Sequence, residues 1–494
     1  MRDWMQALAQ HYARLRAAHP DDQLLVVFDI DGTILDMRYM VCRVLHDYDR
    51  VHGSDLFADL DVDDIDVHEN EIGAFLERRG LGADQRAAVL AWYLERRWAP
   101  DAVLAAHRPY RGVMEVIRWF QIQPATSVAL NTGRPERLRA DTLRSLNELG
   151  REYRVRFDDR LLHMNAADWE VDVAAHKVDG IRRFRKDGFR VVAVVDNEPA
   201  NIAALAAAED TEEVLFLHAD TVYLSRRAPL PRTVGGSSYE LTSLVGEGDL
   251  PRHVQLVWHG VNDDVNLRQF LASAVRWGEV DVRRNRRGDL VLRHDDFASS
   301  PEEPGELLLT PAQVVPRFRA AGKGVKFDVK DGDALDEVLQ VIDELDLPDG
   351  DVWINGRLDA LGEAGVRAVA AAHPGAIVQV PIDFLAPLVA SLPEEARRVV
   401  DGIAELGVNR FSVAWTHPRS RLLLDRLEEW GHDVNLYAVP DLEQFLRAAL
   451  MLPRSITADF NFPEWHYFGR GAGNDGRYHR YRLESLVTPG VDEG

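Results

Sequence analysis

Polar residues suited to phosphate chemistry follow apolar runs in the first half of the chain. One run ends in Asp29 and Asp31, which stand two positions apart, and later runs end in Thr132 and in Asp196. Lys177 opens a stretch with helical periodicity. An aspartyl nucleophile that attacks phosphorus needs a cation, a donor to the phosphate oxygens, a positive charge and a nearby acid. These residues supply such groups in chain order, so the pattern predicts a metal-dependent phosphate site.

Charged residues alternate along two stretches of the second half of the chain. Glu279 and Asp281 stand two positions apart, and Lys326, Asp328 and Lys330 repeat that spacing. On a strand, this spacing puts each set on one face. Lysine and aspartate are almost never buried unless they are paired or bound to a metal. Carboxylates from two strands therefore predict a site for a hard cation.

Two histidines stand near these carboxylates in the sequence. His259 and Asn262 end an apolar run in "LVWHGVN", and His294 precedes Asp295 in "VLRHDD". A single histidine is most simply interpreted as a satisfied surface group. Two histidines beside a cation site can instead share the work of an acid and a base.

The segments that must position the polar residues from Asp29 to Asp196 alternate between strand and helix patterns. This alternation predicts an α/β fold with a doubly wound parallel sheet. A helical insertion at 37–109 interrupts it and contains the acidic run "DLDVDDIDVHENE" at 59–71, which we interpret as a solvated face in preference to a metal site. The expected strands are Gln23–Asp29, Thr126–Asn131, Arg190–Val195 and Val214–Leu217, with helices at Pro135–Leu149, Ala174–Lys186 and Glu198–Ala208.

A stretch rich in Pro, Gly and Ser at 225–249 is typical of a linker. After it, strand and helix patterns alternate about eight times, which is the count of a (β/α)8 TIM-type barrel. The expected domains are therefore 1–224 and 250–494. The barrel strands are expected near Trp258, Asp281, Phe327, Ile354, Val378, Val413, Leu436 and Ala458.

Composition limits the partners of the chain. Its 494 residues exceed the size at which one hydrophobic core usually keeps growing. The formal charge of −23 disfavours nucleic acid and anionic membrane as partners, although a bound cation can bring a small phosphorylated substrate into an acidic site. Cys42 is the single cysteine, and neither a signal peptide nor a membrane span stands out. We therefore expect a cytoplasmic protein and leave its oligomeric state open.

The first series of residues resembles the haloacid-dehalogenase-like (HAD) phosphatases. The resemblance covers about the first 220 residues and rests on the motif "DIDGT" and on the order of the polar segments. It implies Asp29 as the nucleophile, Asp31 as the general acid and base, and the insertion at 37–109 as a cap. In that family a second acidic residue usually follows Asp196, whereas this chain has Asn197 and then Glu198, which alters the expected metal affinity. The resemblance further implies that phosphate is bound by Thr132, Gly133 and Lys177, and Mg²⁺ by Asp29, Asp31 and Asp196.

The second series is similar to the glycerophosphodiester phosphodiesterase-like barrels, and more closely to their menorin branch. The similarity spans Val254 to about Asn461 and includes the K-x-D-x-K strand "KFDVK" and the segments "VWINGRL" and "FSVAWTH". It implies His259 and His294 as base and acid. Asp328 stands where the phosphodiesterases usually carry Glu, which is longer. Mg²⁺ or Ca²⁺ would be held by Glu279, Asp281 and Asp328, and phosphate by Lys330, with Lys326 and Asn262 as further candidates.

The favoured interpretation is a metal-dependent phosphoesterase with two active sites. The barrel would open a phosphodiester and the HAD domain would hydrolyse the resulting monoester. Two alternatives remain open at this point. The barrel could be a binding module without catalytic activity, or the HAD domain could act on the 3′-phosphate ends of nucleic acids.

Overall fold

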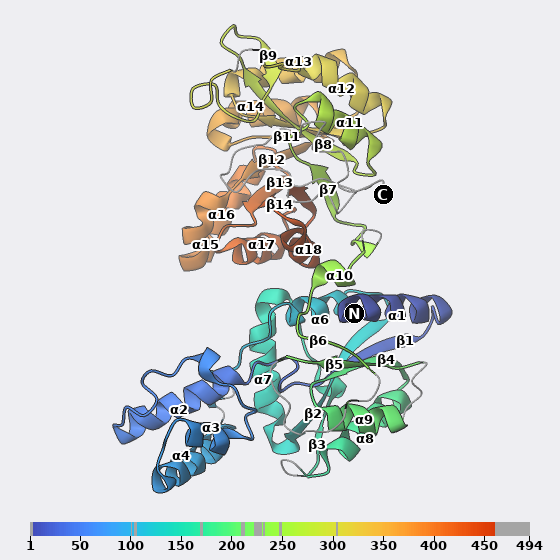
Figure 1. The fold of residues 1–494 in the computed structure, drawn as a ribbon. Helices are drawn as coiled ribbons and strands as arrows, with labels where there is room; N and C mark the ends of the chain where they lie inside the picture. The colour runs from blue at the N-terminus through green and yellow to red at the C-terminus, as the bar shows by residue number, and fades with distance from the viewer. Residues whose placement is uncertain are drawn as a thin grey trace, which may run out of the picture. The chain divides into compact units, whose positions relative to one another are not determined.

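The computed structural model contains two β-sheets, one in each half of the chain, and the strands of both are mainly parallel (Figure 1). The structure describes residues 3–99, 101–102, 106–167, 171–208, 213–221, 230, 233–246, 249–302 and 305–459. The chain divides into two units, Met1–Gly246 and Glu247–Gly494, and each is described by itself. Across the described ranges, no helix combines the length and apolar character needed to cross a membrane.

The sheet of the first unit has the strand order β3-β2-β1-β4-β5-β6, and all its strands run parallel. The order reverses beside β1, so the carboxyl ends of β1, β2 and β4 meet where open α/β sheets bind ligands. The predicted doubly wound α/β fold is confirmed. The strands are β1 (Gln23–Phe28), β2 (Thr126–Pro135), β3 (Leu162–Asn165), β4 (Phe189–Asp196), β5 (Leu215–Ala219) and β6 (Val234–Gly236).

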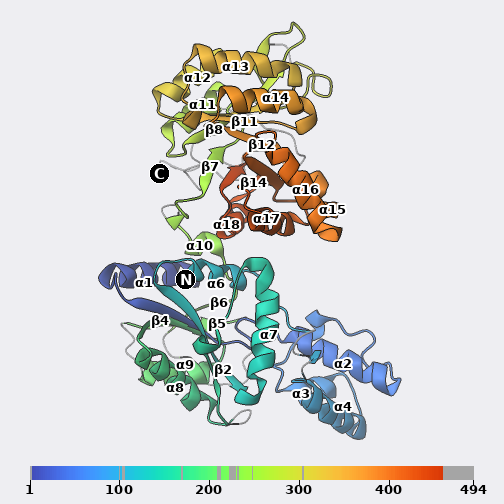
Figure 2. The same ribbon diagram turned by 180° about the vertical axis from the view of Figure 1, so that it is seen from behind.

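Helices cover both faces of this sheet, as the two opposite views show (Figures 1 and 2). α1, α6 and α10 lie on one face, and α8 and α9 lie on the other. On the second face, Val27 and Val194 of the sheet belong to one buried cluster with Ile181, Phe184 and Ile202 of the helices. These helices and α7 are α1 (Trp4–Ala18), α6 (Val113–Gln121), α7 (Arg139–Gly150), α8 (Val173–Lys186), α9 (Pro199–Ala208) and α10 (Leu241–Leu244).

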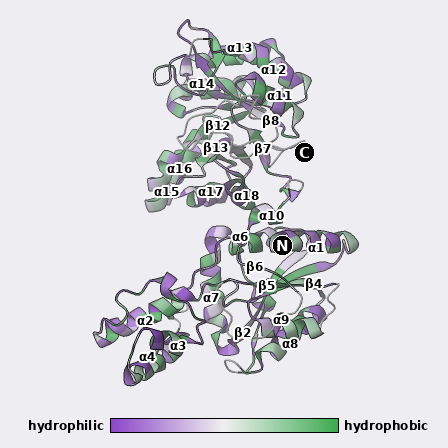
Figure 3. Cartoon of the chain, in the orientation of Figure 1, coloured by the Kyte–Doolittle hydropathy of each residue, from purple (hydrophilic) through white to green (hydrophobic). Residues whose placement is uncertain are grey.

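The insertion at 37–109 is helical, as predicted. Its helices are α2 (Arg38–His52), α3 (Ile72–Arg78) and α4 (Ala83–Arg96), and α4 packs on both of the others. The rings of Tyr48 and Trp92 meet edge to face between α2 and α4, with centroids 6.0 Å apart. Hydrophilic and hydrophobic residues alternate along these helices, which is the amphipathic pattern of helices with one packed face (Figure 3).

Part of the segment predicted as a linker is folded onto the first unit. β6 pairs with β5, and the buried Tyr239 donates a hydrogen bond of 2.8 Å to the Thr33 carbonyl oxygen. Trp4 donates to the Ser238 carbonyl oxygen at 2.6 Å and packs against the Tyr239 ring. The prediction of a linker over all of 225–249 is therefore wrong, because sheet pairing and a buried aromatic ring override the local Gly- and Ser-rich signal. Residues 222–229 lie outside the described part of the chain.

Eight parallel strands close into a barrel in the second unit, which confirms the predicted TIM-type fold. β15 pairs with β7 to close the circle, and the short antiparallel strand β9 (Leu290–Leu292) extends β8. The eight barrel strands coincide with the eight predicted positions. They are β7 (Gln255–Trp258), β8 (Trp277–Arg284), β10 (Gly324–Val329), β11 (Val352–Asn355), β12 (Ile377–Pro381), β13 (Arg410–Ala414), β14 (Val434–Val439) and β15 (Ser455–Ala458).

The interior of the barrel changes from apolar to charged along its axis. Trp277 and Trp353 belong to a buried apolar cluster, with ring centroids 5.4 Å apart. Two and four positions further along β8 stand Glu279 and Asp281, which are also buried. Their position toward the carboxyl end of the strand is where TIM barrels place active sites. The surrounding helices are α11 (Asp264–Ala272), α12 (Pro311–Ala320), α13 (Leu335–Glu344), α14 (Leu358–Ala372), α15 (Ala386–Ser391), α16 (Pro393–Ala404), α17 (Ser420–Glu429) and α18 (Leu442–Leu450).

Candidate active sites

Lys177 joins the two aspartates that follow β1 and end β4. Its Nζ lies 2.6 Å from Asp29 Oδ1 and 2.7 Å from Asp196 Oδ2, and all three side chains are buried. Burial raises the pKa of Asp29, and the neighbouring carboxylates of Asp196 and Asp31 raise it further, while the Lys177 ammonium opposes them. The parallel sheet thus gathers residues that are up to 167 positions apart, and a positive charge is held against the predicted nucleophile.

The Asp29 carboxylate and the Asp31 backbone carbonyl face one point in space. The side-chain amide of Asn197 occupies that point, and when its NH₂ group is turned to donate, it lies 3.2 Å from Asp29 Oδ2 and 3.1 Å from the Asp31 carbonyl oxygen. Mg²⁺ prefers such oxygen ligands and is commonly held by one or two carboxylates. The donor set therefore fits the predicted Mg²⁺, which would take the place of the amide.

Arg134 is a site residue that the sequence interpretation missed. Its guanidinium donates from Nε to Asp31 Oδ2 at 2.8 Å and from Nη2 to Asp31 Oδ1 at 2.6 Å. The side chain is fully buried, with Thr142 as a further partner and the Trp98 ring 5.1 Å from its centre. Two parallel charge-assisted hydrogen bonds fix the orientation of the Asp31 carboxylate. The sequence did carry one signal for Arg134, because it stands two positions after Thr132 in "LNTGR".

The acidic run at 59–71 has two different environments. Asp61, Asp63, Asp64 and Asp66 are exposed, as expected of a solvated face. His68 is buried instead, with its Nε2 3.3 Å from Glu198 Oε1, next to Asn197. For His68 the prediction is wrong, because its ring is buried against Glu198, whereas Asn70 and Glu71 at the end of the run are exposed.

The pKa values of His68 and Glu69 are both shifted from their ordinary values. Burial raises the pKa of Glu69 to about 7, His68 opposes that shift and the Asp31 carboxylate adds to it. Burial alone would lower the pKa of His68, but the carboxylates of Glu198 and Glu69 outweigh it and raise that pKa. The insertion thus contributes titratable groups to the first site.

These residues line one small cavity of about 110 Å³. Thr132 and Gly133 line it beside Asp29, and the Thr132 hydroxyl accepts a hydrogen bond of 3.2 Å from the Arg134 backbone N–H. Glu198 also lines it, and its N–H donates to Asp196 Oδ1 at 2.8 Å. A cavity of this volume accepts a phosphate group with a small substituent. The remaining lining residues include Asp31, His68, Glu69, Asn70, Lys177 and Asn197.

The carboxylates of the barrel are each held by a lysine. Lys326 Nζ lies 3.2 Å from Glu279 Oε2, and Lys330 Nζ lies 2.9 Å from Asp281 Oδ1 and also contacts Asp328. Within the described ranges, Glu279, Asp281 and Asp328 offer ligand atoms within 4.8 Å of one another. The three residues predicted from two strands therefore do meet, and their oxygens suit a hard cation.

Asn262 differs from its predicted role as a phosphate ligand. Its Nδ2 donates to Asp281 Oδ2 at 2.6 Å, and its Oδ1 accepts from the Asp281 backbone N–H at 2.9 Å. Both ends of the amide are thus used to orient Asp281. Asn355 does the same for Asp328, to which it donates at 2.8 Å, and Gln379 in turn donates to Asn355 at 2.7 Å. Amides from neighbouring strands therefore position the carboxylates.

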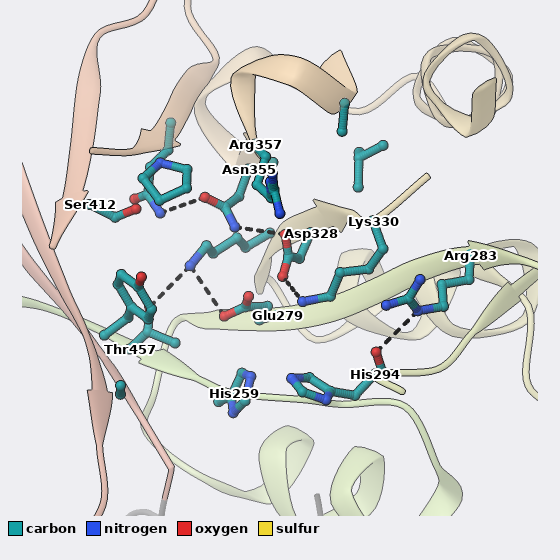
Figure 4. A pocket seen from close by; sticks show the side chains of 18 of the residues that line it. His259, Glu279, Arg283, His294, Asp328, Lys330, Asn355, Arg357, Ser412 and Thr457 are labelled. Atoms are coloured by element: carbon teal, nitrogen blue, oxygen red, sulfur yellow. Dashed lines mark hydrogen bonds and ion pairs between the residues drawn. The ribbon is translucent and has the colours of Figure 1, made fainter. Parts of the chain in front are cut away.

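The two predicted histidines meet at the mouth of the barrel. Their ring centroids are 5.5 Å apart and the rings are nearly perpendicular. His259 Nδ1 lies 2.8 Å from Asp459 Oδ1, and His294 Nδ1 lies 3.1 Å from Asp295 Oδ1. Figure 4 shows them next to one another, across the pocket from Asn355 and Ser412. The sequence interpretation missed Asp459, which directly follows the last barrel strand and carries no local motif.

Burial alone would lower the pKa of His259, but the carboxylate of Asp459 outweighs it, Glu279 and Asp281 add to the effect, and the pKa rises to about 9. His259 is therefore protonated at neutral pH without a bound cation and suits a proton donor better than the predicted base. Burial alone would raise the pKa of Asp281. The charges of Lys330 and of the two histidines outweigh burial and lower that pKa.

We expect Asp459→Asn to lower the pKa of His259 toward its ordinary value, because the largest contribution that raises it is lost. Histidine ring resonances followed by NMR between pH 5 and 10 in the presence of a chelator would measure the shift. Asp401→Asn removes a carboxylate 3.1 Å from His432 and should leave His259 unchanged. An unaltered His259 titration in Asp459→Asn would contradict the assignment.

The second site opens into a larger cavity of about 570 Å³. Lys326 and Thr457, which are 3.1 Å apart, line its interior together with Gln379. Arg283 and Lys330 also line it, so cationic groups accompany the carboxylates. Such a cavity has room and charge for an anionic substrate considerably larger than the first site accepts.

No protein-family model matches the chain, and no curated protein matches it. Solved structures similar to it include glycerophosphodiester phosphodiesterases from Agrobacterium tumefaciens and Thermotoga maritima. Both are 14% identical with TM-scores of 0.30, and they match 42% of this chain and 96% and 94% of their own. A HAD-superfamily hydrolase of subfamily IA, variant 1, from Geobacter sulfurreducens is 13% identical over 45% of this chain and 96% of its own, with a TM-score of 0.28.

These identities and TM-scores are too low to transfer the role of any residue. Both resemblances drawn from the sequence are nevertheless represented among the similar structures, one for phosphodiesterase barrels and one for HAD hydrolases. The menorin branch stays a prediction. The roles proposed below rest on the geometry of this chain.

Proposed function

We propose that the first unit is a Mg²⁺-dependent phosphomonoesterase that works through an aspartyl-phosphate. The observation that carries this proposal is the buried contact of Lys177 with both Asp29 and Asp196 beside Thr132, at the switch point of a parallel sheet. Asp29 would attack phosphorus, and the bond from phosphorus to the leaving alcohol would break as Asp31 protonates that alcohol. Water would then attack the aspartyl-phosphate, give its proton to Asp31 and release phosphate and the Asp29 carboxylate.

Arg134 bears on this sequence of steps because it holds Asp31. A bound phosphate offers the guanidinium alternative oxygens, so substrate binding would free Asp31 to exchange its proton. Asp29, the Asp31 carbonyl oxygen and Asp196 would hold Mg²⁺. The bound ion would neutralise part of the negative charge on the phosphate oxygens.

For the barrel we propose phosphodiesterase activity, because a specific arrangement favours it over a binding module. Two histidines, each with a carboxylate at its Nδ1, lie beside three carboxylates that could hold Mg²⁺ or Ca²⁺. Water would attack the diester, one histidine would accept its proton and the other would protonate the leaving alcohol. The bound cation would polarise the phosphate oxygens.

The two activities form a chemical sequence, since opening a diester yields a monoester. We propose that the barrel acts first and the HAD unit second on a small phosphorylated substrate. The acidic balance of the chain makes a nucleic acid a poor substrate for either site.

A panel of small phosphomonoesters and phosphodiesters, incubated with the full chain, tests this proposal. We expect phosphate release from both classes with Mg²⁺ and its loss in a chelator, since both sites depend on a cation for charge neutralisation. Release that continues undiminished without divalent cations would contradict the metal-dependent mechanism. Monoester hydrolysis without diester hydrolysis would support the alternative in which the barrel only binds a ligand.

A further inference from the structure

A lysine holds the very oxygens with which the barrel carboxylates could bind a cation. Asp281 and Asp328 each give one oxygen, Oδ2 and Oδ1 respectively, to a neighbouring amide. The other oxygen of each contacts Lys330 Nζ, at 2.9 Å for Asp281 Oδ1. The oxygens that no amide uses are thus already bound to an ammonium group.

A divalent cation and this ammonium group exclude each other. Mg²⁺ and Ca²⁺ lie about 2.0–2.6 Å from their oxygen ligands, so an ion bound to the same two oxygens would lie against Lys330 Nζ. Two positive charges at such a separation repel strongly in a site that is largely buried. Asp281 is fully buried, so water offers it little screening.

Lys330 is placed so that it can leave, unlike the other lysine of the site. It follows the end of β10, its side chain is 21% exposed, and it lines the cavity. Lysine carries its charge on a flexible four-carbon stem that can adopt other positions. Lys326 is only 2% exposed on its side chain and is fixed between Glu279 and Thr457.

We propose that Lys330 is the resident cation of this site, and that a divalent cation binds by displacing its ammonium group into the cavity. There the freed group faces the phosphate of the substrate, a consequence that rests on the proposed phosphodiesterase function. The displacement itself concerns metal binding alone. It makes metal affinity a balance between the divalent ion and a positive charge tethered to the chain.

Calorimetric titration with Mn²⁺ or Ca²⁺ tests the displacement without any catalytic readout. The titration would use the full chain with Asp196→Asn, which removes a candidate ligand of the first site. We expect Lys330→Met to bind the cation about tenfold more tightly or better, because a competing positive charge at contact distance is gone. Lys330→Arg, which keeps the charge, should stay near the affinity of the parent.

Lys323→Met is the matched control, since Lys323 donates to the Ser273 and Val275 carbonyl oxygens away from the carboxylates. Equal or weaker binding by Lys330→Met would overturn the proposal, and so would absence of cation binding in both parent and variant. Tighter binding by Lys330→Met, together with a parent that keeps Lys330 and opens no diester, would keep the displacement and remove the proposed phosphodiesterase function.

A second measurement uses the unaltered side chain. An amine-reactive reagent followed by peptide mass spectrometry should modify Lys330 several-fold faster when Ca²⁺ is present, because the displaced ammonium is no longer held by two carboxylates. Lys326 should remain unreactive in both conditions because it is buried. Slower or unchanged modification of Lys330 with Ca²⁺ would overturn the displacement even if the variants failed to fold.

Discussion

Replacing Asp29 by asparagine is expected to lower kcat for phosphomonoester hydrolysis by about ten-thousand-fold or more, as removal of a nucleophile usually does. The amide keeps the volume of the side chain and can still accept a hydrogen bond from Lys177, which lies 2.6 Å away. What is lost is the anionic oxygen that would attack phosphorus. Phosphate release from a small monoester with Mg²⁺ measures the effect in the full chain.

Asp22→Asn is the matched control for this variant. Asp22 stands just before β1, at the opposite end of the strand from Asp29, and its carboxylate pairs with Arg190 at 2.6 Å. The control carries the same change of charge far from the cavity, so its turnover should match the wild type. Turnover close to the wild type in Asp29→Asn, with the fold intact by circular dichroism, would rule out Asp29 as the nucleophile.

Replacing His259 by asparagine should lower phosphodiester hydrolysis by about a hundred- to ten-thousand-fold, the usual contribution of a general acid or base. Hydrolysis of the matching monoester should be unchanged, because His259 belongs to the barrel and the monoester is the proposed substrate of the other unit. In Asp29→Asn the pattern should reverse, and the monoester should accumulate from the diester. Chromatography of diester, monoester and phosphate over time distinguishes these outcomes.

His253→Asn serves as the control, since His253 is exposed and precedes the first barrel strand. If the His259 variant still releases phosphate from the diester at the wild-type rate, the two-step sequence fails and the first unit would act alone. A mixture of Asp29→Asn and His259→Asn proteins should restore phosphate release, because the monoester can diffuse from one protein to the other.

The sequence predicted the barrel well because each strand is a short apolar run between turn signals. The alternation of Lys326, Asp328 and Lys330 also predicted one interior face, and these side chains do lie among the carboxylates. Strand periodicity fixes which residues share a face, whatever the packing around them. It does not fix which partner each charged group meets, so the amide contact of Asn262 with Asp281 could not be foreseen.

Residues brought in from distant segments escaped prediction for the same reason. Asp459 reaches His259 only because the eighth strand closes beside the first, a pairing across 200 residues. His68 approaches Glu198 through the packing of the insertion, although its own surroundings in the sequence are acidic and indicate a surface. Arg134 follows Thr132 by two positions, but a charged residue is fully buried only where a partner such as Asp31 compensates it. Local sequence carries no record of such partners.

The docking of α1 against the last segment of the first unit sets an order of events during synthesis. Trp4 bonds to Ser238, 234 positions later, and Asp3 accepts a hydrogen bond of 2.6 Å from the Ser243 hydroxyl. At the usual rate of about 5–20 residues per second, the ribosome needs roughly 10–50 s to make the partner after α1 has emerged. α1 therefore waits for the segment around Ser238 and Ser243, and the first unit can complete its packing only as translation of the barrel begins.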